Sequence, residues 1–239
     1  MDEIVSKTPR AGMALLVALL ILVSGCGSGV RSPTARTVPH EGDWGIYELS
    51  MTTLNTRLVC SSQSEIQTSA LRLNGAGDRL VFAQKVGGTA DTDSEIFSIG
   101  TDGTQLTRLT ENGLWDLYPA WSPDGRQIAF LSKREHDLDL YAMDAGGGNA
   151  HRLYDSGYHD ADVDWGGDRI VFTSQFAIWC MNSDGTGPRK VSSPPGRGEW
   201  GNANLPKGDY DPRLSRDGGR IVFERLEDTS VPTGDITCS

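Results

Sequence analysis

The sequence predicts an all-β fold, and three observations support this expectation. Segments of similar sequence begin at Gly75, Ser122, Gly166 and Ser215, which indicates a repeat architecture. Within each copy, short apolar runs alternate with Gly and Asp turn residues, a pattern typical of β-strands. No long stretch after residue 40 carries apolar residues at the spacing of a helix.

The spacing of four phenylalanines measures the repeat. Each closes the first strand of a predicted unit, and they are Phe82, Phe130, Phe172 and Phe223. Successive members lie 48, 42 and 51 residues apart, and a four-stranded propeller blade takes roughly 40–50 residues. Leucine-rich repeats are shorter and helical repeats show helical periodicity, so we expect a β-propeller of four-stranded antiparallel blades. The aromatic residues are expected to pack in its core.

Turn residues separate the predicted strands of each unit. The sequence Ser122, Pro123, Asp124 and Gly125 predicts a tight turn, because Asp bonds to nearby backbone and Gly accepts a positive φ. A second apolar run then leads to an Asp-Gly or Gly-Gly pair, which is a strong hairpin signal. A last short strand and a link complete the unit, and the links end at Trp121, Trp165 and Leu214.

The segment Trp121 to Phe130 resembles the WD40-like Pro-Asp repeat of TolB-type β-propellers, in which Trp-Ser-Pro-Asp-Gly leads each blade. The copy at Trp165 lacks the Ser-Pro pair, and the copy at Leu214 lacks both Trp and Pro. The resemblance covers about residues 44–225 and implies the fold of the chain. It implies little about activity, because function depends on sites grafted onto a fold.

The two ends of the repeat region carry half-units. Trp44 to Val59 resembles the second half of a blade, Leu214 to Leu226 resembles the first half, and three full units lie between them. Relatives with this repeat more often have six or seven blades. We therefore expect about four visible blades in a partial or truncated propeller. The alternative is a closed four-bladed ring in which the two halves combine and protect the sheet edges.

Residues 1–25 are expected to form a lipoprotein signal peptide. The apolar run from Ala11 to Val23 follows Lys7 and Arg10, and it is shorter than the ~20 residues that span a bilayer. The run ends before Cys26 in a pattern similar to the bacterial lipobox. This similarity implies cleavage before Cys26 and its acylation, for example with palmitate. The alternatives are an ordinary secretory signal and a membrane-spanning start.

The mature chain is then expected to consist of a flexible tether, residues 26–41, and a propeller, residues 42–239. Gly, Ser and Pro residues in the tether cannot build a core. We expect the protein to be lipid-anchored at the cell membrane or outer membrane, facing the periplasm or the cell exterior. Its net charge of −10 argues against a nucleic-acid partner, which would need a basic surface.

The cysteines lack the spacing of a metal site. Apart from Cys26 they are Cys60, Cys180 and Cys238, so at most one intramolecular disulfide can form among them. Cys180 lies in a predicted strand and is expected to be a buried small hydrophobe. Cys60 and Cys238 form the pair to test.

Three aspartates occupy equivalent positions in the links. Asp116, Asp160 and Asp209 each precede the link end by five residues, and His159, Asp162 and Asp164 lie nearby. On successive blades such residues would form a ring near one mouth of the central channel, where they could attract a cation or a basic partner segment. The alternative is that each Asp caps the turn before its strand. The sequence leaves open whether a metal binds.

The sequence contains no catalytic motif that we recognise. A Gly-x-Ser-x-Gly elbow, a His-Glu-x-x-His helix and a Walker-type loop are all absent, so we expect no cofactor and no enzymatic activity. The leading hypothesis is a non-enzymatic module that binds an envelope protein, peptide or glycan. Relatives with this repeat include polysaccharide lyases and the gating domains of prolyl-oligopeptidase-type peptidases. The alternatives are therefore a propeller-type enzyme or enzyme fragment, and an inactive truncated product.

Overall fold

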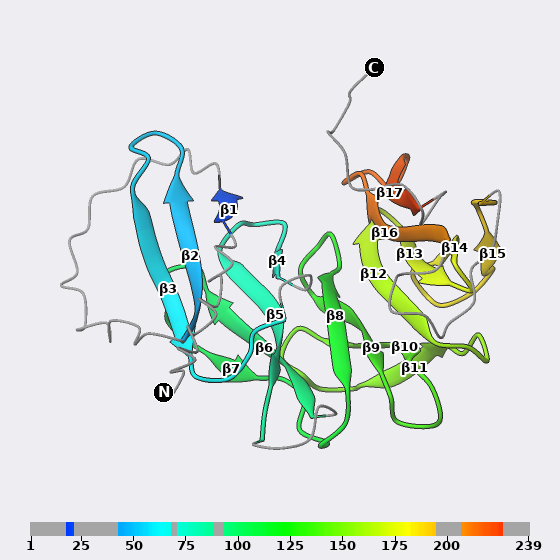
Figure 1. Cartoon of the computed structure of the whole chain (residues 1–239), viewed down its shortest axis with the longest axis horizontal. Coiled ribbons are helices and arrows are strands. Elements are labelled where there is room, and N and C mark those ends of the chain that lie inside the picture. The colour runs from blue at the N-terminus through cyan, green and yellow to red at the C-terminus, as the bar shows by residue number, and fades with distance from the viewer. Residues whose placement is uncertain (1–17, 22–42, 68–70, 88–92, 195–206, 227–239) are drawn as a thin grey trace, which may run out of the picture. The chain divides into compact units, whose positions relative to one another are not determined.

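The computed structural model describes residues 18–21, 43–67, 71–87, 93–194 and 207–226 (Figure 1). Every regular element within these ranges is a β-strand, which confirms the predicted all-β class. The chain divides into two compact units, Met1–Ile66 and Gln67–Ser239. In the described ranges there is no helix of the length and apolar character needed to cross a membrane.

The first unit is built around a hairpin. Strands β2 (Trp44–Ser50) and β3 (Thr56–Ser62) pair antiparallel, and Ile46 and Val59 are its buried apolar residues. A four-residue strand, β1 (Ala18–Ile21), pairs parallel with β2. Cys26, the expected tether and the rest of the expected signal peptide lie outside the described residues.

Among its described residues, the second unit contains three four-stranded antiparallel sheets and one two-stranded sheet. The first sheet consists of β4 (Arg72–Leu73), β5 (Arg79–Lys85), β6 (Ser94–Gly100) and β7 (Thr107–Arg108). The second consists of β8 (Asp116–Trp121), β9 (Gln127–Ser132), β10 (Asp139–Asp144) and β11 (His151–Tyr154). The third consists of β12 (Asp160–Gly166), β13 (Arg169–Ser174), β14 (Ala177–Asn182) and β15 (Arg189–Lys190). The last sheet pairs β16 (Gly208–Leu214) with β17 (Ile221–Leu226).

The repeated aromatic residues lie at one register position. Phe82 is directly opposite Phe97, Phe130 is opposite Tyr141, and Phe172 is opposite Trp179. The three phenylalanines are at most 1% exposed. Their neighbours along the strand are buried as well, because each second strand is covered on both faces. In the sequence, such a strand has apolar residues at successive positions, whereas a strand with one solvent-exposed face has them at every second position.

Packing between successive sheets covers these faces. One core cluster includes residues of the first three sheets, among them Ile96, Phe130 and Phe172. The first strand of each sheet lies at the contact, since β8 touches both β5 and β12, and β12 touches β16. Glycine permits the closest approach. A Cβ atom on Gly166 would lie 2.5 Å from the carbonyl oxygen of Ser215.

The structure corrects one part of the sequence prediction. The links before Trp121, Trp165 and Leu214 are the innermost strands β8, β12 and β16, and these residues stand near the end of each strand. Each strand is interrupted by a bulge at Tyr118, Asp162 or Asp211, whose φ angles are 51°, 55° and 49°. The bulge breaks the alternation that identifies a strand in a sequence.

In the last sheet, apolar residues at the same repeat positions are more exposed than in the preceding sheets. Val222 is 73% exposed and Phe223 is 37% exposed, whereas Phe130 and Phe172, at the equivalent position to Phe223, are fully buried. Within the described residues this sheet has two strands where its three predecessors have four. This agrees with the expectation of partial blades.

The difference between Phe130 and Phe223 gives a stability test. We expect Phe130→Ala to reduce the free energy of unfolding by about 3–5 kcal/mol, because it removes a buried ring and leaves a cavity. Phe223→Ala is the matched control at the same repeat position. It should cost about 1 kcal/mol or less, because the ring is already in contact with solvent. Urea unfolding followed by tryptophan fluorescence measures both, and equal losses would contradict the assigned burial.

Candidate functional site

Buried carboxylates recur where one sheet meets the next. At each of these places, which we call junctions, a backbone hydrogen bond connects the start of a third strand, or the residue before it, with the first strand of the following sheet or the link just before that strand. The three bonds run from Ser94 N to Leu114 O (3.1 Å), from Asp160 N to Leu138 O (3.0 Å) and from Asp209 N to Phe176 O (2.9 Å). The junctions therefore carry polar groups into the region between packed sheets.

Asp116, Asp160 and Asp209 occupy one position at the three junctions, as the sequence spacing suggests. They lie opposite Ser132, Ser174 and Arg225 in the strand registers and are at most 1% exposed. However, each is enclosed in its own junction. Within the described residues they do not form a group whose carboxylate oxygens all lie within 4.8 Å. Each of these carboxylates therefore has its own set of partners, and the ring near a channel mouth stays a prediction.

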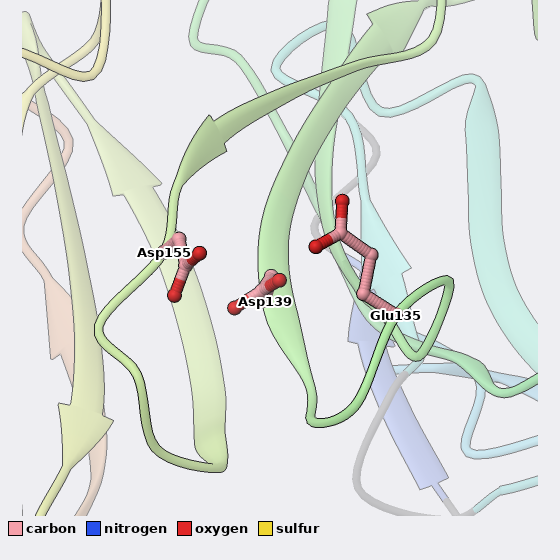
Figure 2. Close-up of side chains that lie close together, drawn as sticks. All are labelled: Glu135, Asp139 and Asp155. Atoms are coloured by element: carbon pink, nitrogen blue, oxygen red, sulfur yellow. The ribbon is translucent and has the colours of Figure 1, made fainter.

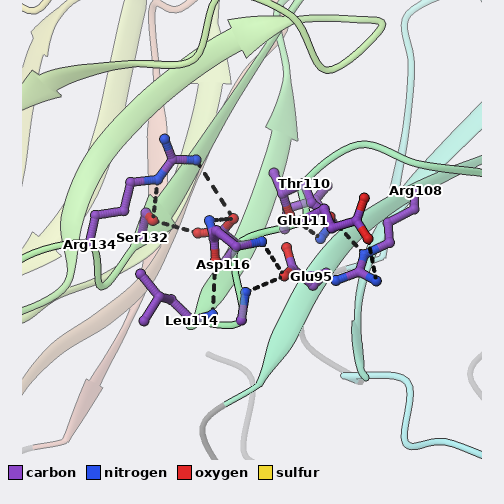
Figure 3. A network of polar contacts seen from close by, with 11 residues as sticks. Glu95, Arg108, Thr110, Glu111, Leu114, Asp116, Ser132 and Arg134 are labelled. Carbon is purple, nitrogen blue, oxygen red and sulfur yellow. Dashed lines mark hydrogen bonds and ion pairs between the residues drawn. The ribbon is translucent and has the colours of Figure 1, made fainter. Parts of the chain in front are cut away.

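The first junction holds Asp116 among several donors (Figure 3). Ser132 Oγ donates a hydrogen bond to one carboxylate oxygen, and Asn112 Nδ2 donates to the other at 2.8 Å. The Arg134 guanidinium lies 3.9 Å away. Burial raises the pKa of Asp116, while the hydrogen bonds and the charge of Arg134 oppose that increase.

Glu95, at the start of β6, belongs to the same junction (Figure 3). Its Oε1 accepts hydrogen bonds from Arg108 Nη2 at 3.0 Å and from the backbone amides of Asn112 at 2.8 Å and Gly113 at 2.9 Å. Burial acts to raise the pKa of Glu95, but these bonds and one from Thr110 outweigh it and hold the pKa below its usual value. The side chain is therefore stabilised as a carboxylate.

The third junction is closed by one arginine. Arg225 Nε and Nη2 donate to the two oxygens of Asp209 at 2.6 and 3.0 Å, a bidentate pair. Burial acts to raise the pKa of Asp209, but the hydrogen bonds from Arg225 and Ser192 and the charge of Arg225 hold it below its usual value. Ala177 stands where Glu95 and Asp139 stand in the other junctions, so Asp209 is the one buried carboxylate of this junction among the described residues.

The second junction has two buried carboxylates and few donors. Ser156 Oγ donates to Asp160 Oδ1 at 2.7 Å, and Asp160 Oδ2 has no hydrogen-bond partner. Burial raises the pKa of Asp160 to about 7, with a further contribution from Asp139 and Asp137. Burial likewise raises the pKa of Asp139 to about 6, together with the charges of Asp155 and Asp137. His159 is adjacent, and its Nδ1 accepts a hydrogen bond from the Leu138 amide at 3.2 Å.

The inner strands carry a second polar group, which we call the inner-strand cluster. Asp162 Oδ2 accepts a hydrogen bond from the Asp211 amide at 3.2 Å, and Asp164 Oδ2 accepts one from the Leu214 amide at 2.7 Å. Side chains of β12 thus hold the backbone of β16. The cluster consists of Arg72, Asp162, Asp164, Asp211 and Arg213.

Charges within the inner-strand cluster are mixed. Arg213 Nη2 lies 2.5 Å from Asp211 Oδ1. Burial and the charge of Arg213 lower the pKa of Arg72, while Asp164, Asp211 and Asp162 oppose that decrease. Sequence reasoning noticed Asp162 and Asp164 but missed the two arginines and Asp211. The repeated Asp-x-Asp spacing at 160–162 and 209–211 is the signal that could have identified Asp211.

The predicted turn at Ser122 to Gly125 is held by its own side chains. Ser122 Oγ donates to Asp124 Oδ1 at 2.7 Å, the Gln127 amide donates to Ser122 Oγ at 2.9 Å, and Gly125 has a φ of 70°. Ser215 and Asp217 form the same bond in the last sheet, at 2.5 Å. Pro123 has no counterpart there, so the Ser–Asp pair is sufficient to form the turn. Its position and its partners indicate a structural role.

The described side chains show no nucleophile beside a base. His151 Nδ1 contacts the carbonyl of Asn149 at 2.9 Å, and His159 accepts from a backbone amide, so neither hydrogen-bonds a Ser or Cys side chain. Cys60 and Cys180 have free thiols, and burial raises the pKa of Cys60 to about 11, which disfavours the reactive thiolate. Cys180 is buried, as predicted, and Cys238 lies outside the described residues.

Comparison with known proteins agrees with this architecture. The TolB β-propeller domain matches residues 44–199 of the chain, which is more than half of its length. The chain belongs to this family. A TolB homologue of Chlorobium luteolum is 30% identical over 152 residues, which cover 62% of this chain and 31% of that protein. The chain spans less than half the length of the curated relatives that it matches.

Solved structures show the same fold. TolB from Acinetobacter baumannii aligns with a TM-score of 0.58 at 18% identity, covering 74% of this chain and 42% of that one. An oligogalacturonate lyase in complex with manganese aligns with a TM-score of 0.54 at 14% identity, covering 74% of this chain and 52% of that one. At these identities the likeness establishes the propeller fold of the chain, as predicted, and not its activity.

The contrast between Asp160 and Asp209 predicts opposite effects of removing a charge. The raised pKa of Asp160 means that the folded state retains a proton that the unfolded state releases between about pH 4 and pH 7. Stability contributed by this group is therefore lost as the pH rises through that window. We expect Asp160→Asn to be more stable than the parent protein at pH 8, by about 1–3 kcal/mol.

Asp209→Asn is the matched control for Asp160→Asn. The lowered pKa of Asp209 means that its carboxylate contributes stability at neutral pH, which is lost only as the pH falls below its ordinary pKa. The substitution should cost about 1–3 kcal/mol at pH 8, because Arg225 loses its charged partner. Urea unfolding at pH 5, 6, 7 and 8 measures both variants. Destabilisation by both at pH 8 would contradict the assignment for Asp160.

Proposed function

We propose that this chain is a lipid-anchored, extracytoplasmic propeller that acts as a non-enzymatic binding module in the bacterial cell envelope. The observation that carries this proposal is the set of hydrogen bonds and ion pairs in the inner-strand cluster. Asp162 and Asp164 of β12 accept hydrogen bonds from backbone amides of β16, and an ion pair joins Asp211 to Arg213 within β16. These mixed charges are therefore held on rigid strands. Rigid, preorganised polar groups support recognition of a partner, and no described nucleophile lies beside a base.

The expected partner is an envelope protein, a peptide or a glycan, with no role for nucleic acid. The mixed charges of Arg72, Asp211 and Arg213 suit a partner that presents both hydrogen-bond donors and acceptors. The net charge of −10 disfavours binding to a polyanion. Family membership supports the same class of function, since the chain belongs to the TolB β-propeller domain family.

Capture of a partner from envelope membranes tests the binding role. The full chain with a C-terminal tag is cross-linked in cells, purified, and compared with Asp211→Asn and Asp168→Asn. Asn also tolerates the positive φ at position 211, so Asp211→Asn removes a charge with little backbone strain. Asp168 is the control, with a side chain 85% exposed outside the cluster. We expect Asp211→Asn to reduce the captured partner several-fold and Asp168→Asn to leave it unchanged. Equal capture by all three proteins would contradict binding through the inner strands.

The proposed anchor depends on Cys26, which is separated from the apolar run only by Ser24 and Gly25. Acyl chains on this residue would hold the protein at a membrane, with each buried methylene contributing about 0.8 kcal/mol. We expect the parent to incorporate radiolabelled palmitate and to enter the detergent phase of Triton X-114. Cys26→Ser should do neither, while Cys60→Ser serves as the control and should behave like the parent. Labelling of Cys26→Ser would remove the anchor from the proposal.

The alternative is a propeller-type enzyme, favoured by the fold that the chain shares with the oligogalacturonate lyase. Two histidines of the described ranges make backbone contacts, and no described group of histidines forms a metal cluster. An assay with oligogalacturonate and manganese separates the hypotheses, because lyase cleavage creates an unsaturated product that absorbs ultraviolet light. Turnover by the purified chain would favour the enzyme.

A further inference from the structure

Three carboxylates converge at the second junction (Figure 2). Glu135, Asp139 and Asp155 each offer an oxygen, and these oxygens lie within 4.8 Å of one another. Glu135 comes from the loop between β9 and β10, Asp139 begins β10, and Asp155 follows β11. In Figure 2 the Asp139 carboxylate lies between the other two. We call these three residues the acidic junction.

Asp139 is the residue that distinguishes this group from an ordinary exposed acidic patch. It is 1% exposed, and its Oδ1 has no hydrogen-bond partner. Nearby, the equally buried Asp160 also leaves one oxygen, Oδ2, without a partner. Buried carboxylates without donors are costly, and they are normally paired or coordinate a cation.

The other two junctions show how the same positions are satisfied elsewhere in the chain. Glu95, the counterpart of Asp139, also has an orphaned oxygen, but its Oε1 accepts three N–H bonds, one of them from Arg108. Asp209, the counterpart of Asp160, is paired with Arg225 through both oxygens. The repeat therefore serves as an internal comparison, in which only the second junction leaves both of its carboxylates poorly paired.

One arginine nitrogen lies close to all three carboxylates of the acidic junction. Arg152 Nη1 lies 3.0 Å from Glu135, 3.1 Å from Asp155 and 3.6 Å from Asp139. Its side chain is 37% exposed and comes from β11, the outer edge strand of its sheet, so it can turn toward solvent without disturbing the core. A single positive charge leaves most of the negative charge of this junction unbalanced, because Asp137 and Asp160 also act on it.

We propose that the acidic junction binds a divalent cation, with Glu135, Asp139 and Asp155 as ligands and Arg152 displaced toward solvent. The donor set contains oxygen alone, which suits a hard cation. Two of the three ligands lie in or beside loops, which suits the variable geometry of Ca²⁺ better than the strict octahedron of Mg²⁺. The bound ion would join the β9–β10 loop and the start of β10 to the segment that follows β11.

Calorimetry on the full chain in detergent, after removal of metal with EDTA, tests this proposal. We expect the parent to bind Ca²⁺ at one site, with Mg²⁺ at least about tenfold weaker. Asp139→Asn should weaken Ca²⁺ binding at least about tenfold, because it removes the buried ligand charge. Arg152→Gln should strengthen it, because the competing cation is gone. Asp168→Asn is the control and should match the parent, since its carboxylate lies outside the junction.

Two further measurements keep the result independent of folding defects. Circular dichroism checks that each variant retains the β-sheet signal of the parent. Terbium luminescence reports the location of the site, because Tyr154 adjoins Asp155 and can transfer energy to a bound Tb³⁺ that Ca²⁺ then displaces. Absence of heat and of terbium emission in both the parent and Arg152→Gln would overturn the proposal. Unchanged Ca²⁺ affinity in a folded Asp139→Asn would overturn it as well, by placing the ion elsewhere.

Discussion

The structure depends on burying the second strand of each sheet between two neighbouring sheets. Ile128 to Leu131 of β9 are all fully buried, so neither face of this strand is left for solvent. Removal of such apolar surface from water is the main favourable contribution to folding. The same packing also encloses the ends of the strands, where the chain must pass from one sheet to the next. Buried polar groups at the junctions are thus a direct consequence of the arrangement that stabilises the core.

Each junction handles its buried carboxylates in a different way. In the first, backbone amides and two arginines surround Glu95 and Asp116. In the third, a single bidentate arginine pairs with Asp209. In the second, desolvation prevails, and the pKa values of Asp139 and Asp160 rise. Copies of one repeat can therefore have the same backbone fold and still differ in the charges and pKa values of equivalent residues. Functional differences between blades can arise from these electrostatic differences.

The sequence predicts the class and the period of the fold well, because both depend on local signals. The phenylalanine spacing and the Ser–Asp turns are properties of short segments, and the structure has Phe82, Phe130 and Phe172 at one register position. The innermost strands resemble links in the sequence, because a positive φ within each one shifts the alternation of side chains. Such bulges leave no simple pattern in the sequence.

The candidate sites could be predicted only in part. Equivalent spacing correctly placed Asp116, Asp160 and Asp209 at one structural position, but spacing cannot show that each is enclosed separately. The pairing of Asp209 with Arg225 requires knowledge of the strand register. The sequence gives no signal for Asp139, because it follows the charged run from Lys133 to Asp137, which is typical of a solvated loop. Its burial arises from tertiary packing, which a single sequence does not contain.

The close approach at Gly166 has a consequence for the angle between two neighbouring sheets. The backbone of the third sheet rests almost directly on the carbonyl of Ser215 in the fourth, with no room for a methyl group. A larger residue there would act as a spacer at the inner end of the contact alone. The angle between the third and fourth sheets is consequently set in part by the absence of a single carbon atom.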